Sequence, residues 1–156
     1  MKKAIEVQAP NVIPANAEKL TNVFLAGSIE MGTADEWQKR IIDELSDIPI
    51  RFLNPRRNDW DASWNEENNK DLLVEQIIWE LTSLEISDMI VLYFDPKTKS
   101  PISLLEMGLH ARGKKLIVLC PNGFWKKTNV DVTCEFYDID QVDTFDELIK
   151  YLRNNL

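Results

Sequence analysis

The feature that most limits the fold of this chain is the alternation of strand-like and helix-like segments along it. Buried strands are predicted at 22–28, 48–55, 88–96 and 114–121, with a further short strand at 136–139. Amphipathic helices are predicted at 32–45, 72–86 and 143–156, and Ser100 with Pro101 is typical of the start of another helix. We therefore expect an α/β fold: a single-domain doubly wound parallel sheet, flavodoxin-like or Rossmann-like, with about five strands flanked by helices.

The first 21 residues have a less regular pattern than the rest. Pro10 and Pro14 interrupt them, so we expect an N-terminal extension at 1–21 and one domain at 22–156. A chain of 156 residues has the length of one domain, which buries roughly 70% of the surface of its unfolded state. Thr33 and Glu36 have the spacing of a capping box at the start of the first predicted helix.

Composition and charge exclude several classes of partner. The net charge of -8 produces an average field that repels nucleic acid and anionic membranes. No apolar run reaches the ~18 residues of a membrane span, and Glu6 and Gln8 interrupt the first apolar run before a signal-peptide core forms. We expect a cytoplasmic protein in which Cys120 and Cys134 are buried, reduced thiols.

Two glutamates stand close to apolar helix faces. Ile102, Leu105 and Leu109 form an apolar stripe that should face the core, and Glu106 falls inside this stripe. Glu80 borders the predicted core stripe of its own helix. That stripe consists of Leu73, Ile77, Leu81 and Leu84. We therefore expect two acids from separate helices to meet at one cleft.

Ligands of doubly wound sheets bind beyond the carboxyl ends of the strands. The residues at these ends are Gly27, Ser28, Asn54, Arg56, Arg57, Asp95 and Ser100. Gly27 lets a backbone come close to a ligand, and Ser28 is suited to hold a hydroxyl or a phosphate.

The role of the two arginines stays open at this point. Arg56 and Arg57 are suited to bidentate contacts with a phosphate, but they are equally suited to pair with Asp59 or Asp61.

Paired carboxylates suit the cleavage of a glycosidic bond, in which one acid attacks the sugar and the other transfers a proton. Buried acids also serve as partners of a structural arginine or of a helix cap, so this chemistry does not follow from the pattern alone.

Five segments of the chain, in order, resemble the nucleoside 2-deoxyribosyltransferase-like family, a branch of the N-glycosidic bond enzymes that includes deoxynucleoside 5'-monophosphate N-glycosidases. The segments are VFLAGSIE (23–30), NPRRNDWDASW (54–64), EQIIWEL (75–81), SPISLLEMGLHARGKK (100–115) and CPNGFWKKTNV (120–130). The resemblance implies that Glu106 is the nucleophile that attacks the anomeric carbon of a deoxyribose. It implies a proton-transfer role for Glu80, although relatives usually have an aspartate there.

The resemblance also bears on substrate binding. It places Ser100 near a sugar hydroxyl or a 5'-phosphate, and Asn129 where transferases contribute an asparagine to a neighbouring subunit's site. Glu30 stands where the monophosphate hydrolases have a basic residue, which favours a nucleoside over a nucleotide. Trp60 and Trp64 are expected either to stack on a nucleobase or to pack against a neighbouring helix or subunit.

Three further residues complete the predictions. Trp79 and Ile86 are expected to form an exposed apolar ridge that favours a homo-oligomer, and His110 is expected at a helix surface.

The expected function is cleavage of a 2'-deoxynucleoside with transfer of the sugar to another base or to water, without a metal or an organic cofactor. The alternatives are a hydrolase of deoxynucleoside monophosphates and a non-catalytic nucleotide-binding module.

Overall fold

The computed structural model describes residues 3–29, 34–61 and 63–156. Its centre is a parallel sheet with the strand order β1-β3-β2-β4-β5-β6. The strands are β1 (Ile5–Gln8), β2 (Thr21–Gly27), β3 (Ile50–Asn54), β4 (Met89–Tyr93), β5 (Leu116–Leu119) and β6 (Asp140–Val142). The helices are α1 (Trp37–Glu44), α2 (Lys70–Ile86), α3 (Pro101–His110), α4 (Lys127–Tyr137) and α5 (Phe145–Asn155).

The doubly wound α/β fold is confirmed, and the sheet has one strand more than expected. The order β3-β2-β4-β5-β6 is the flavodoxin-like order, and β1 extends it at the β3 edge. Part of the segment before residue 22 therefore belongs to the sheet. A short last strand completes the sheet as predicted, but it begins at Asp140 and not at 136, because Phe136 and Tyr137 end α4.

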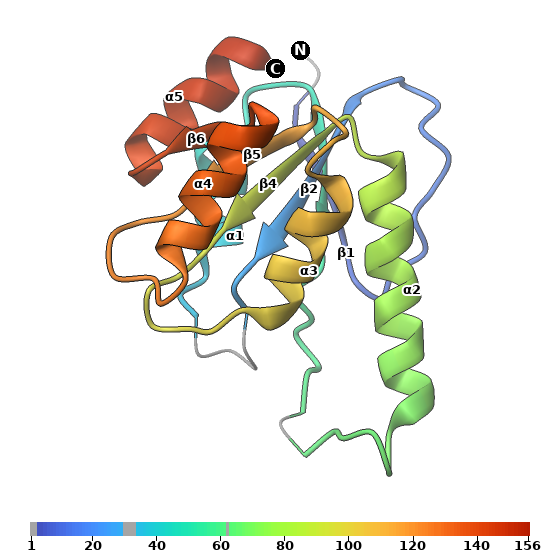
Figure 1. Cartoon of the computed structure of the whole chain (residues 1–156). Helices are drawn as coiled ribbons and strands as arrows, with labels where there is room; N and C mark the ends of the chain where they lie inside the picture. Colours follow the sequence, from blue (N-terminus) through green and yellow to red (C-terminus); the bar gives the residue numbers. More distant parts are fainter. Residues whose placement is uncertain (1–2, 30–33, 62) are drawn as a thin grey trace.

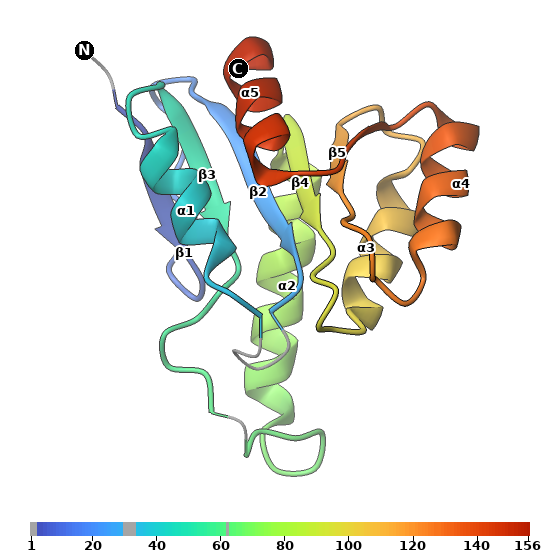
Figure 2. The same cartoon turned by 90° about the vertical axis from the view of Figure 1, so that its left-hand side faces the viewer.

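The helices cover both faces of the sheet (Figures 1 and 2). Alternate side chains of β2 show the two layers: Phe24 packs on the face covered by α2, α3 and α4, whereas Leu25 packs on the face covered by α1 and α5. Central strands buried on both faces read as continuous apolar runs, which is why their positions follow from the sequence.

The helix α1 packs its apolar face on the sheet. Trp37, Ile41 and Leu45 are buried and Ile42 is partly buried. The predicted capping box includes Thr33, which lies outside the described residues. Leu148, Ile149 and Leu152 of α5 are buried.

The predicted core face of α2 is right for Leu84, which is buried, and partly for Leu73, which is half-buried, but wrong for its middle part. Ile77 and Leu81 are about half exposed, whereas Trp79, which was expected on an exposed ridge, is 8% exposed and donates a hydrogen bond to the Asn11 carbonyl. Apolar residues occur all around this helix, so periodicity does not define one face. Ile86 is exposed, as predicted.

The predicted core face of α3 is also wrong. Ile102, Leu105 and Leu109 are each more than half exposed. The buried face consists of Ser103, Glu106, Met107 and His110. His110 follows Glu106 by one helical turn, so it faces inward with it and does not lie at the surface as predicted.

Candidate active site

A cavity of about 620 Å³ lies beyond the carboxyl ends of β2 and β3, between α2 and α3. This is the position at which the strand order of the sheet reverses, because the chain leaves β2 toward β3 and returns to β4 on the other side. The lining residues include Gly27, Pro55, Arg56, Arg57, Trp60, Gln76, Glu80, Ser100 and Glu106.

Gly27 forms the floor of the cavity at the end of β2. Its φ of 134° is strained for any residue with a side chain, and a Cβ atom there would lie 2.3 Å from the carbonyl oxygen of Tyr93. A glycine is therefore required for β2 to pass this close to β4.

Glu106 projects from the second turn of α3 into the cavity and is 8% exposed. Burial raises the pKa of its carboxyl group to about 8, and the negative charge of Glu80 adds to this effect. Among the described residues, no cationic side chain forms an ion pair with Glu106. The alternative of an acid buried to serve a structural arginine is therefore not observed.

Glu80 reaches the same cavity from α2. Burial raises the pKa of this carboxyl group, and a hydrogen bond of 2.8 Å from Gln76 Nε2 to Glu80 Oε1 opposes the increase. The buried carboxylate of Glu106 and the half-buried carboxylate of Glu80 thus interact across one cavity. Such a pair loses its two protons in separate steps that belong to the pair.

The two arginines have different partners. Arg57 pairs with both carboxylate oxygens of Asp59 at 2.9 Å and with Glu75 at 3.5 Å, so the predicted alternative of pairing with Asp59 is confirmed for Arg57. Arg56 donates hydrogen bonds to Gln38 Oε1 and to the backbone carbonyls of Ala34 and Asp35. Burial lowers the pKa of Arg56.

A cluster of hydroxyl groups supports the loop between β4 and α3. Ser28 Oγ accepts hydrogen bonds from the Asp95 backbone N–H and from Thr98 Oγ1, both at 2.8 Å, and it also bonds Ser100 Oγ. Ser100 lines the cavity, whereas Ser28 and Asp95 are buried beneath it and do not line it. Ser100 is therefore better placed than Ser28 to contact a ligand.

The two tryptophans of the loop after β3 pack on each other with ring centroids 5.1 Å apart. Trp60 lines the cavity, and its buried indole N–H has no hydrogen-bond partner among the described residues. Trp64 does not line the cavity. Its ring lies beneath the Arg57 guanidinium, whose Cζ atom is 5.2 Å from the Trp64 ring centroid.

The two predicted asparagines do not line the cavity. Asn54 is buried at the end of β3, where it bonds Glu6 Oε1 and the backbone N–H of Arg56. Asn129 is exposed on α4. Glu30 lies outside the described residues.

Sequence reasoning missed several lining residues, among them Glu36, Glu66 and Gln76. Gln76 precedes Glu80 by four residues, and this spacing places both side chains on the same face of α2. That spacing is the signal that would have identified Gln76.

Comparisons with known proteins bear on the family and the fold. A family model described as "Nucleoside 2-deoxyribosyltransferase like" matches residues 20–124, which include β2 to β5 and both acids of the cavity. The fold is similar to the crystal structure of a conserved protein from Enterococcus faecalis V583, with a TM-score of 0.60 and 15% identity over 88% of this chain and 99% of that chain. No curated protein matches the sequence significantly. None of the described helices has the length and apolar character needed to cross a membrane. The match over two thirds of its length shows that this chain belongs to the nucleoside 2-deoxyribosyltransferase-like family.

Proposed function

We propose that the protein cleaves the N-glycosidic bond of 2'-deoxynucleosides and transfers the deoxyribosyl group to another nucleobase or to water. The observation that carries this proposal is the convergence of Glu80 and Glu106, from α2 and α3, on one cavity at the switch point of the sheet. The family match supports a nucleoside-type ligand for this cavity.

Glu106 is the nucleophile of the proposed reaction. Its carboxylate forms a bond to the anomeric carbon as the bond between that carbon and the base nitrogen breaks, and the bonding electrons leave with the base. Glu80 donates a proton to the leaving base. In the second step, a new base or a water molecule attacks the anomeric carbon, Glu80 takes its proton, and the Glu106 carboxylate is released.

The protonation of the pair sets the reactive form. Burial raises the pKa of both acids, so the pair holds one proton between its two titrations. With its pKa raised to about 8, Glu106 holds a proton at neutral pH in the free protein. The reactive arrangement is the one in which this proton has moved to Glu80, so that Glu106 is ionised.

The charges around the cavity support a nucleoside as the substrate. Of the residues that the structure describes, four glutamates line the cavity, and Arg57 is already paired with Asp59 and Glu75. This environment disfavours a 5'-phosphate. A hydrolase of deoxynucleoside monophosphates is the second candidate, because Arg56 and Ser100 also line the cavity, and the Arg56 guanidinium donates its hydrogen bonds to Gln38 Oε1 and to backbone carbonyls.

We also propose that the protein is a homo-oligomer in which α2 and α3 form the interface. The exposed large apolar residues of these helices are Val74, Ile77, Ile78, Leu81, Ile86, Ile102, Leu105 and Leu109. Ile77 and Ile102 also line the cavity, so a second copy on this surface would border the mouth of the site.

The test is incubation with a panel of deoxynucleosides and deoxynucleoside monophosphates, with released base measured by chromatography. Addition of a second free base separates transfer from hydrolysis, because only a transferase forms the new nucleoside. Replacement of Glu106 by alanine should abolish turnover and retain ligand binding. A wild-type protein that binds nucleotides and turns none of them over would instead be the binding module.

A further inference from the structure

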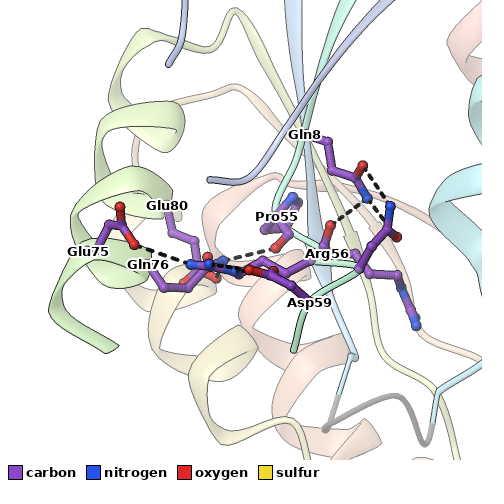
Figure 3. A network of polar contacts seen from close by, with 9 residues as sticks. Gln8, Pro55, Arg56, Asp59, Glu75, Gln76 and Glu80 are labelled. Carbon is purple, nitrogen blue, oxygen red and sulfur yellow. Dashed lines mark hydrogen bonds and ion pairs between the residues drawn. The ribbon is translucent and has the colours of Figure 1, made fainter. Parts of the chain in front are cut away.

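Gln76 connects Glu80 to the sheet. It lies on α2 one turn before Glu80, is 7% exposed and lines the cavity. Its side-chain nitrogen donates two hydrogen bonds, one of 2.9 Å to the carbonyl oxygen of Pro55 and one of 2.8 Å to Glu80 Oε1 (Figure 3). Pro55 directly follows β3, so the Glu80 carboxylate is tied through Gln76 to the end of a central strand.

The orientation of the Gln76 amide is determined by Pro55. A backbone carbonyl only accepts hydrogen bonds, so the nitrogen of the amide, and not its oxygen, must face Pro55. The same nitrogen then directs its second hydrogen to Glu80. The opposite orientation would place the amide oxygen against two acceptors. In the observed orientation the buried Oε1 of Gln76 has no partner among the described residues. The free-energy cost of this unsatisfied acceptor is offset by the two hydrogen bonds that the nitrogen donates.

We propose that Gln76 is a positioning residue that fixes Glu80 Oε1 as a hydrogen-bond acceptor and so leaves Oε2 as the oxygen that carries the proton. An unsupported carboxyl group could present its proton on either oxygen and in several rotamers. Because Gln76 holds Oε1 as an acceptor, the proton of Glu80 is on Oε2 in a fixed orientation. Proton transfer to a leaving base then does not require the carboxyl group to reorient first. The part of this inference that concerns proton transfer rests on the proposed function.

Other charged groups share the cavity with Glu80. Glu106 faces it from α3, Arg56 and Arg57 from the loop after β3, Glu66 from the same loop, and Glu36 from the segment before α1. None of these groups donates a hydrogen bond to Glu80 in the described structure, where Gln76 is its side-chain donor. Loss of the Gln76 side chain should therefore change the pKa of Glu80 directly.

The experiment is a carbon-13 NMR titration of the glutamate side-chain carboxyl groups in the wild type and in Gln76→Met. Methionine has a similar length and no donor. Gln76→Leu is a second variant of different shape, so a packing fault of one side chain is not mistaken for the loss of a donor. Glu80→Gln and Glu106→Gln assign the two signals. The matched control is Gln141→Met, because Gln141 on β6 also donates to a carboxylate, Asp131, but lies away from the cavity.

Both Gln76 variants should raise the titration midpoint of Glu80 by about one pH unit, a tenfold change in its ionisation constant, whereas Gln141→Met leaves it unchanged. With an active wild type, kcat should fall about tenfold, and KM should change less than threefold. The descending limb of the pH profile, which reports the loss of the Glu80 proton, should also move to higher pH. A Glu80 signal that titrates in both variants at the wild-type pH would overturn the role of Gln76. Absence of turnover in the wild type would instead refute the proposed function, and the NMR titration would still decide the role of Gln76.

Discussion

Replacement of Glu106 by glutamine should stabilise the folded protein at alkaline pH, because the buried acid loses its proton there and the amide does not. Folding raises the pKa of Glu106 from 4.5 to about 8. At 1.36 kcal/mol for each pH unit, full ionisation of the buried group costs about 5 kcal/mol. The side chain is 8% exposed, so solvent screening of this cost is small.

The sign follows from proton binding. Between the two pKa values the folded state binds the proton of Glu106 more tightly than the unfolded state, so the stability contribution is complete below about 4.5 and is lost as the pH rises through 8. The wild type should therefore lose about 4 kcal/mol more free energy of unfolding than Glu106→Gln between pH 5 and pH 9.

The assay is urea-induced unfolding of both proteins at the two pH values. Glu135→Gln, at an exposed position of α4, is the control and should follow the wild type. If the wild type and Glu106→Gln change in parallel, the carboxyl group does not titrate as a buried acid, and the reasoning about the pair is wrong.

Three further predictions follow from the same structure. Initial rates measured from pH 5 to 9 should give a bell-shaped pH profile of kcat/KM, with a descending limb near pH 8 where the pair loses its last proton. Glu80→Gln should remove this limb and lower kcat about 100-fold or more. The double substitution Ile78→Glu and Leu105→Glu should convert the proposed oligomer to a monomer, as measured by light scattering. The control Phe136→Glu, at an exposed position of α4, should leave the oligomer intact. A wild type that is already monomeric would contradict the interface. Gly27→Ala should destabilise the protein by about 2 to 4 kcal/mol in urea unfolding, because the new Cβ would meet the Tyr93 carbonyl. The control Gly108→Ala has open space around its Cβ and should be neutral or slightly stabilising. Equal effects of the two substitutions would refute the close approach of β2 and β4.

The central strands and most helices could be predicted from the sequence. Strands β2 to β5 are buried on both faces, and this burial requires the continuous apolar segments that the sequence contains. Strand β1 could not be predicted, because Glu6 and Gln8 interrupt its apolar pattern. Its place is decided by pairing with β3, a contact between residues more than 40 positions apart.

The inward position of Glu106 was predicted, but from a stripe that proved to be exposed. Apolar side chains occur on more than one face of α2 and α3, so the pattern does not tell the face that covers the sheet from an apolar surface left exposed. Packing against the sheet decided this rotation, and it brought Ser103, Met107 and His110 inward together with Glu106.

The residues that carry the proposed chemistry were therefore readable in the chain, whereas their environment was not. The sequence by itself determined an alternating α/β fold, the strand ends at which polar residues gather, and the family resemblance of its motifs. Only the tertiary structure decided that Glu80 and Glu106 share one cavity, that Arg57 is neutralised by Asp59 and Glu75, and that Gln76 joins Glu80 to β3. The reason is physical: burial and hydrogen bonding depend on which helix faces meet across the sheet, and local periodicity carries no information about that contact.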